Sequence, residues 1–277
     1  MKEKILKALY VYRARFIISM KLYFRYPLNA AFTFFDPLIW LTPFYFMGKS
    51  FSVNGHMTGF SKYTGNSDFM GFLVIGYMVT AYVATVFWSI GFSLREEMQQ
   101  GVLESNWSAP VGRITLIVSK SLSKFAITTV EVIITGIVCH FTFGFNLNGN
   151  ILKAIGFLIP GIIGLMGLGM AIAGLVLIAK NANPIIDLTN SILAGFSGSF
   201  FPIKVMPRGF TFISLIIPLT YIYDSTRALL INQEPLFSLK KEFIIVIVTM
   251  IIMCILGNYI FLKIDRRCRE KGNLATH

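Results

Sequence analysis

Long apolar blocks separated by short polar connections make up most of the chain. A helix needs about 20 mainly apolar residues to cross the hydrocarbon core of a bilayer, and blocks of roughly this length recur along the sequence. Six are candidate transmembrane spans: 28–48, 70–93, 114–143, 151–179, 184–201 and 243–263. The pattern predicts an all-α integral membrane protein with six transmembrane helices, in a single transmembrane domain that covers residues 1–277.

Ahead of the first span, residues 2–25 show a helical period. Apolar and aromatic residues make one face and basic residues the other: Ile5, Leu9, Tyr12, Phe16, Met20 and Tyr23 against Lys4, Lys7, Arg15, Lys21 and Arg25. This pattern is typical of an amphipathic helix that lies in the headgroup plane. The alternative is a plain basic flank that fixes the topology. Pro27 should end the helix, because the residue before a proline is disfavoured in the α region.

The placement of the basic residues indicates the topology. The net charge is +12, and residues 1–26 hold seven of the 25 Lys and Arg, with five more in 263–271. Basic flanks of membrane spans stay in the cytoplasm, so we expect both termini to be cytoplasmic in a cell (cytoplasmic) membrane. Only 14% of the residues are charged, against about 25% in soluble domains. No basic soluble module is visible, so no nucleic-acid partner is expected.

Sequence motifs for catalysis are missing. Gly48-Lys49-Ser50 resembles the end of a P-loop, but Pro43 stands where the motif needs its first glycine. Neither the three histidines nor the three cysteines have the spacing of a metal site or a disulfide framework. We therefore expect no catalytic residue, metal or cofactor on this chain. An intramembrane enzyme built from separated acids stays open as an alternative; its candidates are Asp36, Glu131, Asp187 and Asp224.

Two acids fall well inside predicted spans, away from the span ends. Asp36 lies in the first and Glu131 in the third. An ionised side chain that faces lipid there costs roughly 2.5 kcal/mol or more, so both should be protonated, paired or turned toward a cavity. An interhelical hydrogen bond and a polar point on a translocation path are both open.

A polar segment, residues 95–110, must surface between the second and third spans. Its residues Glu97, Gly101, Leu103, Glu104 and Pro110 resemble the coupling segment by which permeases of the type-2 ABC transporter family contact their ATPase. In that family an acidic residue precedes Gly-Thr-Leu-Glu and a later proline, and here a valine stands where threonine is usual. The resemblance implies that 95–110 is a cytoplasmic coupling helix.

A second resemblance to this family lies between the fifth and last spans. Residues 202–242 mix apolar runs with prolines, which predicts broken helices that enter the membrane from the extracellular side and return. The family has a Pro-bearing break, a Pro-Leu-Thr-Tyr-like segment, an acid and an Arg; the matching residues are Pro202, Pro207, Pro218, Tyr221, Asp224 and Arg227. The last two are three apart, so on a helix they share a face and are expected to pair.

Together the motifs imply a permease subunit similar to the drug-resistance and lipooligosaccharide exporters, a placement that also uses the first span, residues 25–40. The resemblance implies two copies of a separate ATPase that holds ATP and Mg, and a second permease, identical or related. The cargo would be amphipathic or lipid-like: a drug, a peptide or a lipid-linked glycan. A structural membrane subunit with no transport role is the other alternative.

Overall fold

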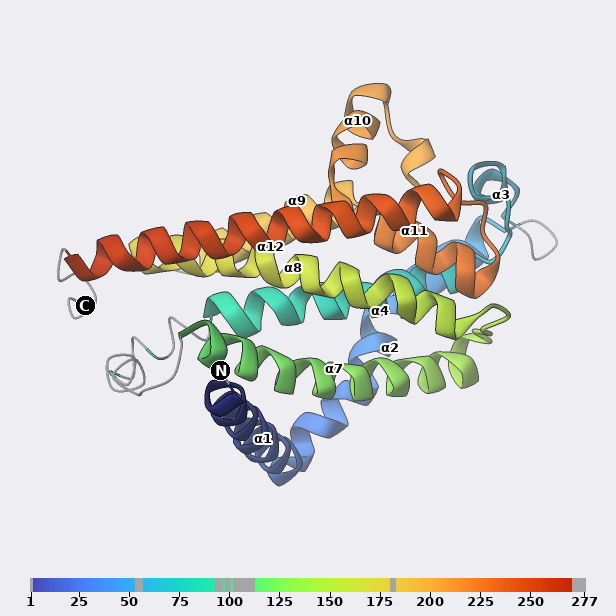
Figure 1. Ribbon diagram of the computed structural model, residues 1–277. Helices are drawn as coiled ribbons and strands as arrows, with labels where there is room; N and C mark the ends of the chain where they lie inside the picture. The colour runs from blue at the N-terminus through green and yellow to red at the C-terminus, as the bar shows by residue number, and fades with distance from the viewer. Residues whose placement is uncertain are drawn as a thin grey trace.

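The computed structural model describes residues 2–52, 57–92, 97, 101, 113–179 and 183–270, and throughout these ranges the regular structure is helical (Figure 1). The elements are α1 (Lys2–Arg25), α2 (Pro27–Ser50), α3 (Thr58–Thr64), α4 (Phe69–Phe87), the π-helical turn η1 (Trp88–Phe92), α7 (Arg113–Phe143), α8 (Ile151–Ala179), α9 (Asn183–Phe196), the 3₁₀ turn η2 (Ile203–Val205), α10 (Arg208–Ile216), α11 (Pro218–Ile231) and α12 (Leu239–Glu270).

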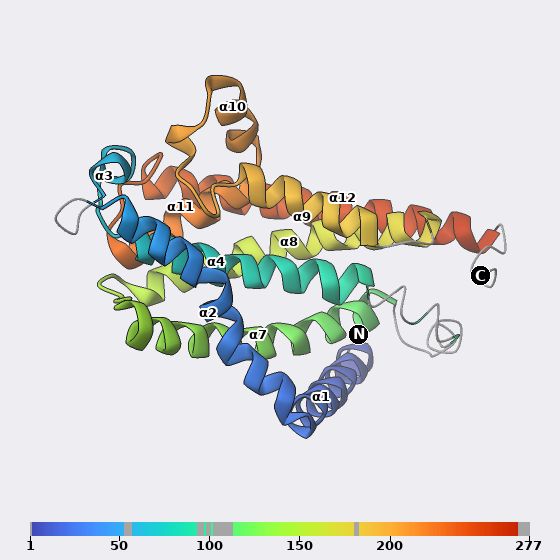
Figure 2. The ribbon, with the colours of Figure 1, turned by 180° about the vertical axis from the view of Figure 1, so that it is seen from behind.

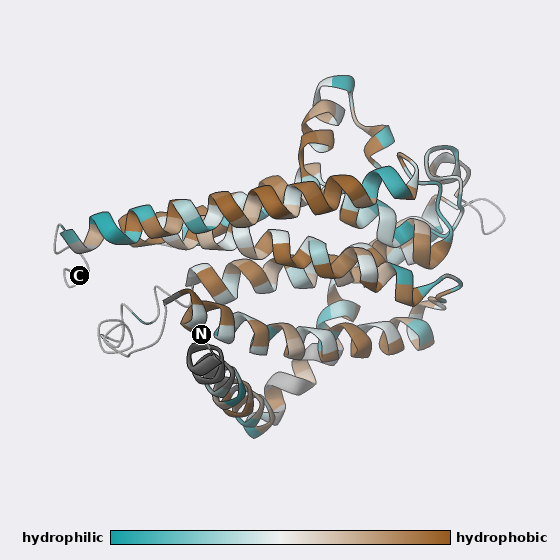
Figure 3. Ribbon diagram, in the orientation of Figure 1, coloured by the Kyte–Doolittle hydropathy of each residue, from teal (hydrophilic) through white to brown (hydrophobic). Residues whose placement is uncertain are grey.

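Four of the predicted spans are confirmed as helices long and apolar enough to cross a membrane. They are Phe69–Gly91, Ile114–Phe143, Ile151–Ile178 and Leu239–Cys268. Figure 3 shows apolar residues along the middle of these helices, and hydrophilic residues gathered at both ends of α12. The chain is therefore a multi-pass membrane protein.

The other two predicted spans have a different form. The first is one continuous helix, α2, which runs through Pro37 and Pro43 and carries Asp36 in its middle. The fifth, α9, has 14 residues and ends at Phe196, short of the break expected at Phe201-Pro202. A helix of that length spans about 21 Å, less than the roughly 30 Å hydrocarbon core. Of the six expected spans, four thus meet the length and composition of a membrane span.

Helices α8 and α12 pack closely because glycines remove side chains from their interface. A Cβ atom built on Gly257 would lie 1.8 Å from the Gly167 carbonyl oxygen, and one on Gly167 would lie 2.5 Å from the Met253 backbone. Both contacts are with backbone, so no side-chain rotation could relieve them. Glycine therefore permits the close approach that small residues allow between membrane helices. Gly169, also on α8, faces Val86 and Ile90 instead.

Helix α11 is the buried centre of the region after α9. Pro218 begins it in the first turn, where a missing N–H costs nothing. Asn232, in the left-handed conformation at φ 54°, ends it. Twelve of its residues are buried. The last α11 carbonyls accept hydrogen bonds from neighbouring loops, including Asn148 N–H to Leu230 and Asn150 N–H to Leu229.

The two ends of the bundle differ. The C-terminal end of α12, the end of η1 and the start of α7 lie at one end (left in Figure 1), which we call the C-terminal end. Helices α3 and α11 lie at the other, the α11 end. Helix α1 keeps its predicted bounds and is foreshortened in Figures 1 and 2, so it runs across the direction of the long helices. That orientation fits a helix lying along the membrane surface.

Candidate functional site

A cavity of about 900 Å³ lies among α1, α2, α4, η1 and α7, and we call it the main cavity. Its wall combines aromatic, hydroxyl and charged side chains: Tyr23, Asp36, Trp40, Tyr77, Thr80, Ala81, Ala84, Thr85, Trp88, Ser89, Lys120, Lys124, Ile127, Thr128, Glu131 and Phe200. A smaller cavity of about 270 Å³ shares Asp36, Tyr77, Ala81 and Glu131 with it. The structure thus brings together, on adjoining cavities, the two acids predicted to be polar points within spans.

One face of α7 supplies the charged part of this wall. Lys120, Lys124, Thr128 and Glu131 are spaced by four, four and three residues, so they lie on one stripe of the helix. The rise along the helix places Glu131 about 16 Å from Lys120. Cations therefore lie toward the C-terminal end of the bundle, and the carboxylate lies deeper in the predicted span. The two lysines, one turn apart near the start of α7, thus belong to the cavity wall.

Both acids in the cavity have hydroxyl partners from other helices. The Tyr77 hydroxyl of α4 donates to Oδ2 of Asp36 in α2. The Tyr23 hydroxyl of α1 forms a side-chain hydrogen bond with Glu131 of α7. Each acid therefore links two helices and also lines a cavity. The two alternatives from the sequence, an interhelical hydrogen bond and a polar point on a translocation path, are therefore compatible.

Hydroxyl contacts hold α4 and η1 against α7 along the cavity. The distances are 2.6 Å between the Thr85 and Thr128 hydroxyl oxygens, 3.1 Å from Tyr82 to Thr129, and 3.4 Å from Ser89 to Ser121. Such interhelical hydrogen bonds contribute modestly in a membrane, about 0.6 kcal/mol each on average, and their repetition fixes the register of the two helices. The wall is therefore formed by paired helices.

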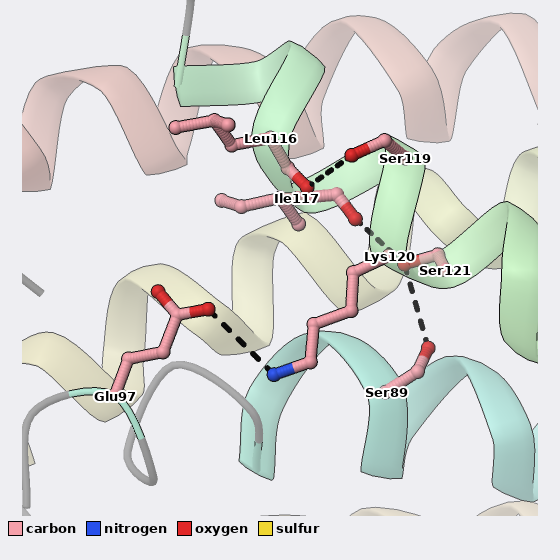
Figure 4. Close-up of polar contacts among 7 residues, drawn as sticks. All are labelled: Ser89, Glu97, Leu116, Ile117, Ser119, Lys120 and Ser121. Carbon is pink, nitrogen blue, oxygen red and sulfur yellow. Dashed lines mark hydrogen bonds and ion pairs between the residues drawn. The ribbon is translucent and has the colours of Figure 1, made fainter. Parts of the chain in front are cut away.

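The predicted coupling segment, residues 95–110, touches this wall through Glu97. Its carboxylate Oε1 lies 3.6 Å from the Lys120 ammonium (Figure 4), and the two side chains are 16% and 26% exposed. Figure 4 also shows that Lys120 leaves α7 one residue before Ser121, which contacts Ser89. A segment expected to face a partner is thus tied by an ion pair to a residue of the main cavity. Sequence spacing gave no signal for this pair.

Gly101 supports the turn in the coupling segment. Its φ is +67°, in the left-handed region that favours glycine. A Cβ atom there would meet nothing within 4 Å, so glycine is favoured at this position by the backbone conformation and not by a close contact. The predicted coupling residues Leu103, Glu104 and Pro110 lie outside the described residues.

The predicted ion pair between Asp224 and Arg227 is wrong, because the two side chains bind different elements. The Arg227 guanidinium is 3% exposed and donates to three backbone carbonyls: Nε to Phe72 (3.1 Å), Nη1 to Gly198 (2.6 Å) and Nη2 to Ser199. It also lies 3.4 Å from the Phe72 ring centroid. Arg227 therefore joins the end of α9 to α4 and α11.

Asp224 instead holds the connection between α11 and α12. Its carboxylate accepts hydrogen bonds from Leu236 N–H (2.6 Å) and the Gln233 amide (3.4 Å). Burial raises the pKa of Asp224, and the Leu236 N–H acts against this shift. The neighbouring carboxyl of Glu242 accepts from the Ser225 hydroxyl and from Phe237 N–H (3.1 Å). Two adjacent buried carboxyls thus fix this connection, and the sequence reading missed Glu242.

The remaining predicted residues of the re-entrant region have structural positions. Pro202 and Pro207 precede η2 and α10, and Tyr221 donates its hydroxyl to the Leu215 carbonyl at 2.7 Å. None of the predicted residues from Pro202 to Arg227 belongs to the wall of the main cavity as the structure describes it. The geometry favours a framework role for this region over cargo contact.

A multi-pass chain whose described residues form helices around a cavity with apolar and charged lining has the form of a membrane transport protein. The family model of the ABC-2 type transporter matches residues 11–231. The chain therefore belongs to the ABC-2 type transporter family and is a permease, as the motifs indicated. Members of this family are transport membrane components, typically not themselves catalytic, and the family implies an ABC ATPase partner. No curated protein sequence matches the chain.

Proposed function

We propose that this chain is the membrane subunit of an ABC exporter that moves an amphipathic or lipid-like cargo out across the cytoplasmic membrane by alternating access. Two permeases, identical or related, form the pathway, and two copies of an ATPase bind the cytoplasmic face. ATP and Mg are held by that ATPase and not by this chain. Both termini and residues 95–110 are cytoplasmic, and residues 202–242 lie on the extracellular side.

The observation that carries this proposal is the contact between the coupling segment and the cavity wall. Glu97 belongs to the segment that resembles the ATPase-binding element, and it pairs with Lys120, which lines the main cavity. A push on the segment would therefore act directly on α7. Since α7 is bonded to α4 through Thr85–Thr128, both helices would move together. Rigid-body movement of packed helices around a fixed site is how alternating access operates in other transporters.

The cavity chemistry supports an amphipathic cargo. Tryptophan and tyrosine rings provide apolar area, and the charged groups stand in a line on α7. Ligand sites of this size are mostly apolar with a few placed polar groups. A drug, a peptide or a lipid-linked glycan each combines an apolar body with polar groups.

The coupling role is tested by reversing charge at Glu97 and Glu104 together. The double variant should lose export and separate ATP hydrolysis from transport in reconstituted vesicles that contain the permease and its ATPase. Its size-exclusion profile should remain that of the folded protein, which separates a loss of coupling from a loss of folding. Unchanged export in the double variant would contradict the coupling role.

A charge exchange separates the two roles of Glu97. Glu97→Lys combined with Lys120→Glu restores opposite charges across the 3.6 Å contact but presents a cation to the partner. If Glu97 acts on the ATPase, complex formation with the ATPase stays weakened in this variant. Restored complex formation would show that Glu97 acts through Lys120 alone.

A further inference from the structure

Two lysines and two tryptophans line the main cavity. Lys120 and Lys124 are one turn apart on α7, and Trp40 of α2 and Trp88 of η1 line the same cavity. The tryptophans are 57% and 42% exposed. Wide aromatic surface and ammonium groups in one cavity fit a molecule that joins an anionic head to an apolar body.

The charge inventory of the cavity decides which sign the cargo should carry. Asp36 and Glu131 each already receive a tyrosine hydroxyl. Among the described residues, the Lys124 ammonium takes part in no hydrogen bond and no ion pair, and the charged group that acts on it is Glu131, two turns further along α7. A cation inside a predicted span needs an acceptor. The two acids accept hydrogen bonds from the chain, whereas the Lys124 ammonium has no acceptor among the described residues. An anionic cargo would supply that acceptor.

We propose that the main cavity binds an amphipathic anion, with its phosphate or carboxylate head between Lys120 and Lys124 and its apolar body against Trp40 and Trp88. The proposal rests on the exporter function above and names its substrate class. Glu131 lies about 10 Å beyond Lys124 along α7, so its charge confines an anionic head to the lysine end of the cavity.

Lys120 connects this site to the coupling segment. It lines the cavity and also holds Glu97 at 3.6 Å. An anionic head that approaches Lys120 competes with the Glu97 carboxylate for the same ammonium group. Cargo binding thereby loosens the coupling segment from α7, which gives the segment a way to respond to an occupied cavity.

The tryptophans make the site directly measurable. The chain has three tryptophans, and Trp107→Phe leaves Trp40 and Trp88, both in the cavity wall, as the only reporters. The purified permease, without an ATPase, is placed in nanodiscs of zwitterionic lipid. It is titrated with dodecyl phosphate brominated on the chain, whose bromine quenches tryptophan, and in parallel with the equally brominated dodecyl trimethylammonium.

We expect saturable quenching by the phosphate amphiphile and only linear, partition-driven quenching by the ammonium amphiphile. Lys124→Gln should weaken the saturable binding about tenfold or more. Lys124→Arg should retain it, which guards against a variant that fails to fold. Lys153→Gln, at an exposed lysine of α8 outside the cavity wall, is the matched control and should change nothing.

Glu97→Gln provides a second readout that a purely structural lysine would not show. Removing the competing carboxylate should tighten binding of the phosphate amphiphile by up to about fivefold, as expected for a partly exposed ion pair. Inorganic phosphate at the same concentration should not displace the amphiphile, since it lacks the apolar body.

Three results would overturn the proposal: equal saturable binding of both head groups, no effect of Lys124→Gln, or displacement by inorganic phosphate alone. Because the ATPase is absent from this experiment, such a failure leaves the coupling role of residues 95–110 untouched. Conversely, if the charge-reversal experiment contradicts the coupling role, a positive binding result on the permease alone still stands.

Discussion

Replacing Arg227 by methionine should destabilise the whole α11 end of the bundle. The guanidinium donates to the carbonyls of Phe72, Gly198 and Ser199 and is 3% exposed. Methionine fills part of the space but donates nothing, so three buried acceptors lose their partner. Each unsatisfied buried group costs about 1–3 kcal/mol. Relaxation and partial substitution by water reduce the sum, and we expect a loss of about 3 kcal/mol or more.

The assay is heating in detergent followed by size-exclusion chromatography, which measures the fraction of folded protein against temperature. Arg208→Met is the matched control, because Arg208 is an exposed arginine at the start of α10 in the same region. Arg227→Met should melt well below the wild-type temperature, whereas Arg208→Met should melt at the wild-type temperature. Equal melting temperatures for the two variants would refute the framework role. A changed cargo affinity with unchanged stability would instead indicate that Arg227 touches cargo.

Two further substitutions test other parts of the structure. Gly257→Ala places a Cβ atom 1.8 Å from the Gly167 carbonyl oxygen, so the overpacked α8–α12 contact should lose about 1–3 kcal/mol in the same melting assay. Gly156→Ala, where nothing lies within 4 Å, should be neutral or gain up to about 1 kcal/mol. Tyr77→Phe removes the hydroxyl that Asp36 accepts; export into reconstituted vesicles should slow while stability changes by less than about 1.5 kcal/mol.

The length of the hydrophobic blocks was enough to predict a membrane protein and four of its spans. Backbone N–H and C=O groups in hydrocarbon must be hydrogen-bonded within the protein, and a helix satisfies them within a single segment. It overestimated the fifth span. The apolar run continues past Phe196, but the helix ends there and Gly198 turns the chain at φ +77°. Hydropathy does not register that turn, since serine and glycine lie near the middle of the hydropathy scale and break an apolar run only weakly. The Ser197-Gly198-Ser199 run was the available signal.

Helical spacing identified faces but not partners. Asp224 and Arg227 do share α11, yet Arg227 reaches Ser199 because Gly76 of α4 has no side chain: a Cβ there would lie 2.1 Å from the Ser199 carbonyl oxygen. Such an opening depends on three elements far apart in sequence. The same limit applies to Lys120 and Glu97, which belong to different segments of the chain and whose contact no spacing rule predicts.

The cavity stripe on α7 was within reach of sequence reasoning. Lys120, Lys124 and Glu131 recur at helical spacing inside a predicted span, and charged residues in such spans face cavities or partners. The spacing places the two lysines and Glu131 on one face of the helix, but it does not show that this face lines a cavity. The opposite wall, with Trp40 and Tyr77, required the packing of α2 and α4 to be known.

The central claim is that residues 95–110 receive force from an ATPase on the cytoplasmic side. Its most direct test is photo-crosslinking in intact cells from a benzoylphenylalanine placed at position 104, with the same group at Asn146, in the short α7–α8 connection at the α11 end, as control. We predict a crosslink from position 104, and none from position 146, to a polypeptide that mass spectrometry shows to carry a P-loop. Labelling of a cysteine at position 104 by a membrane-impermeant reagent added outside the cell, with no P-loop polypeptide captured, would contradict the account.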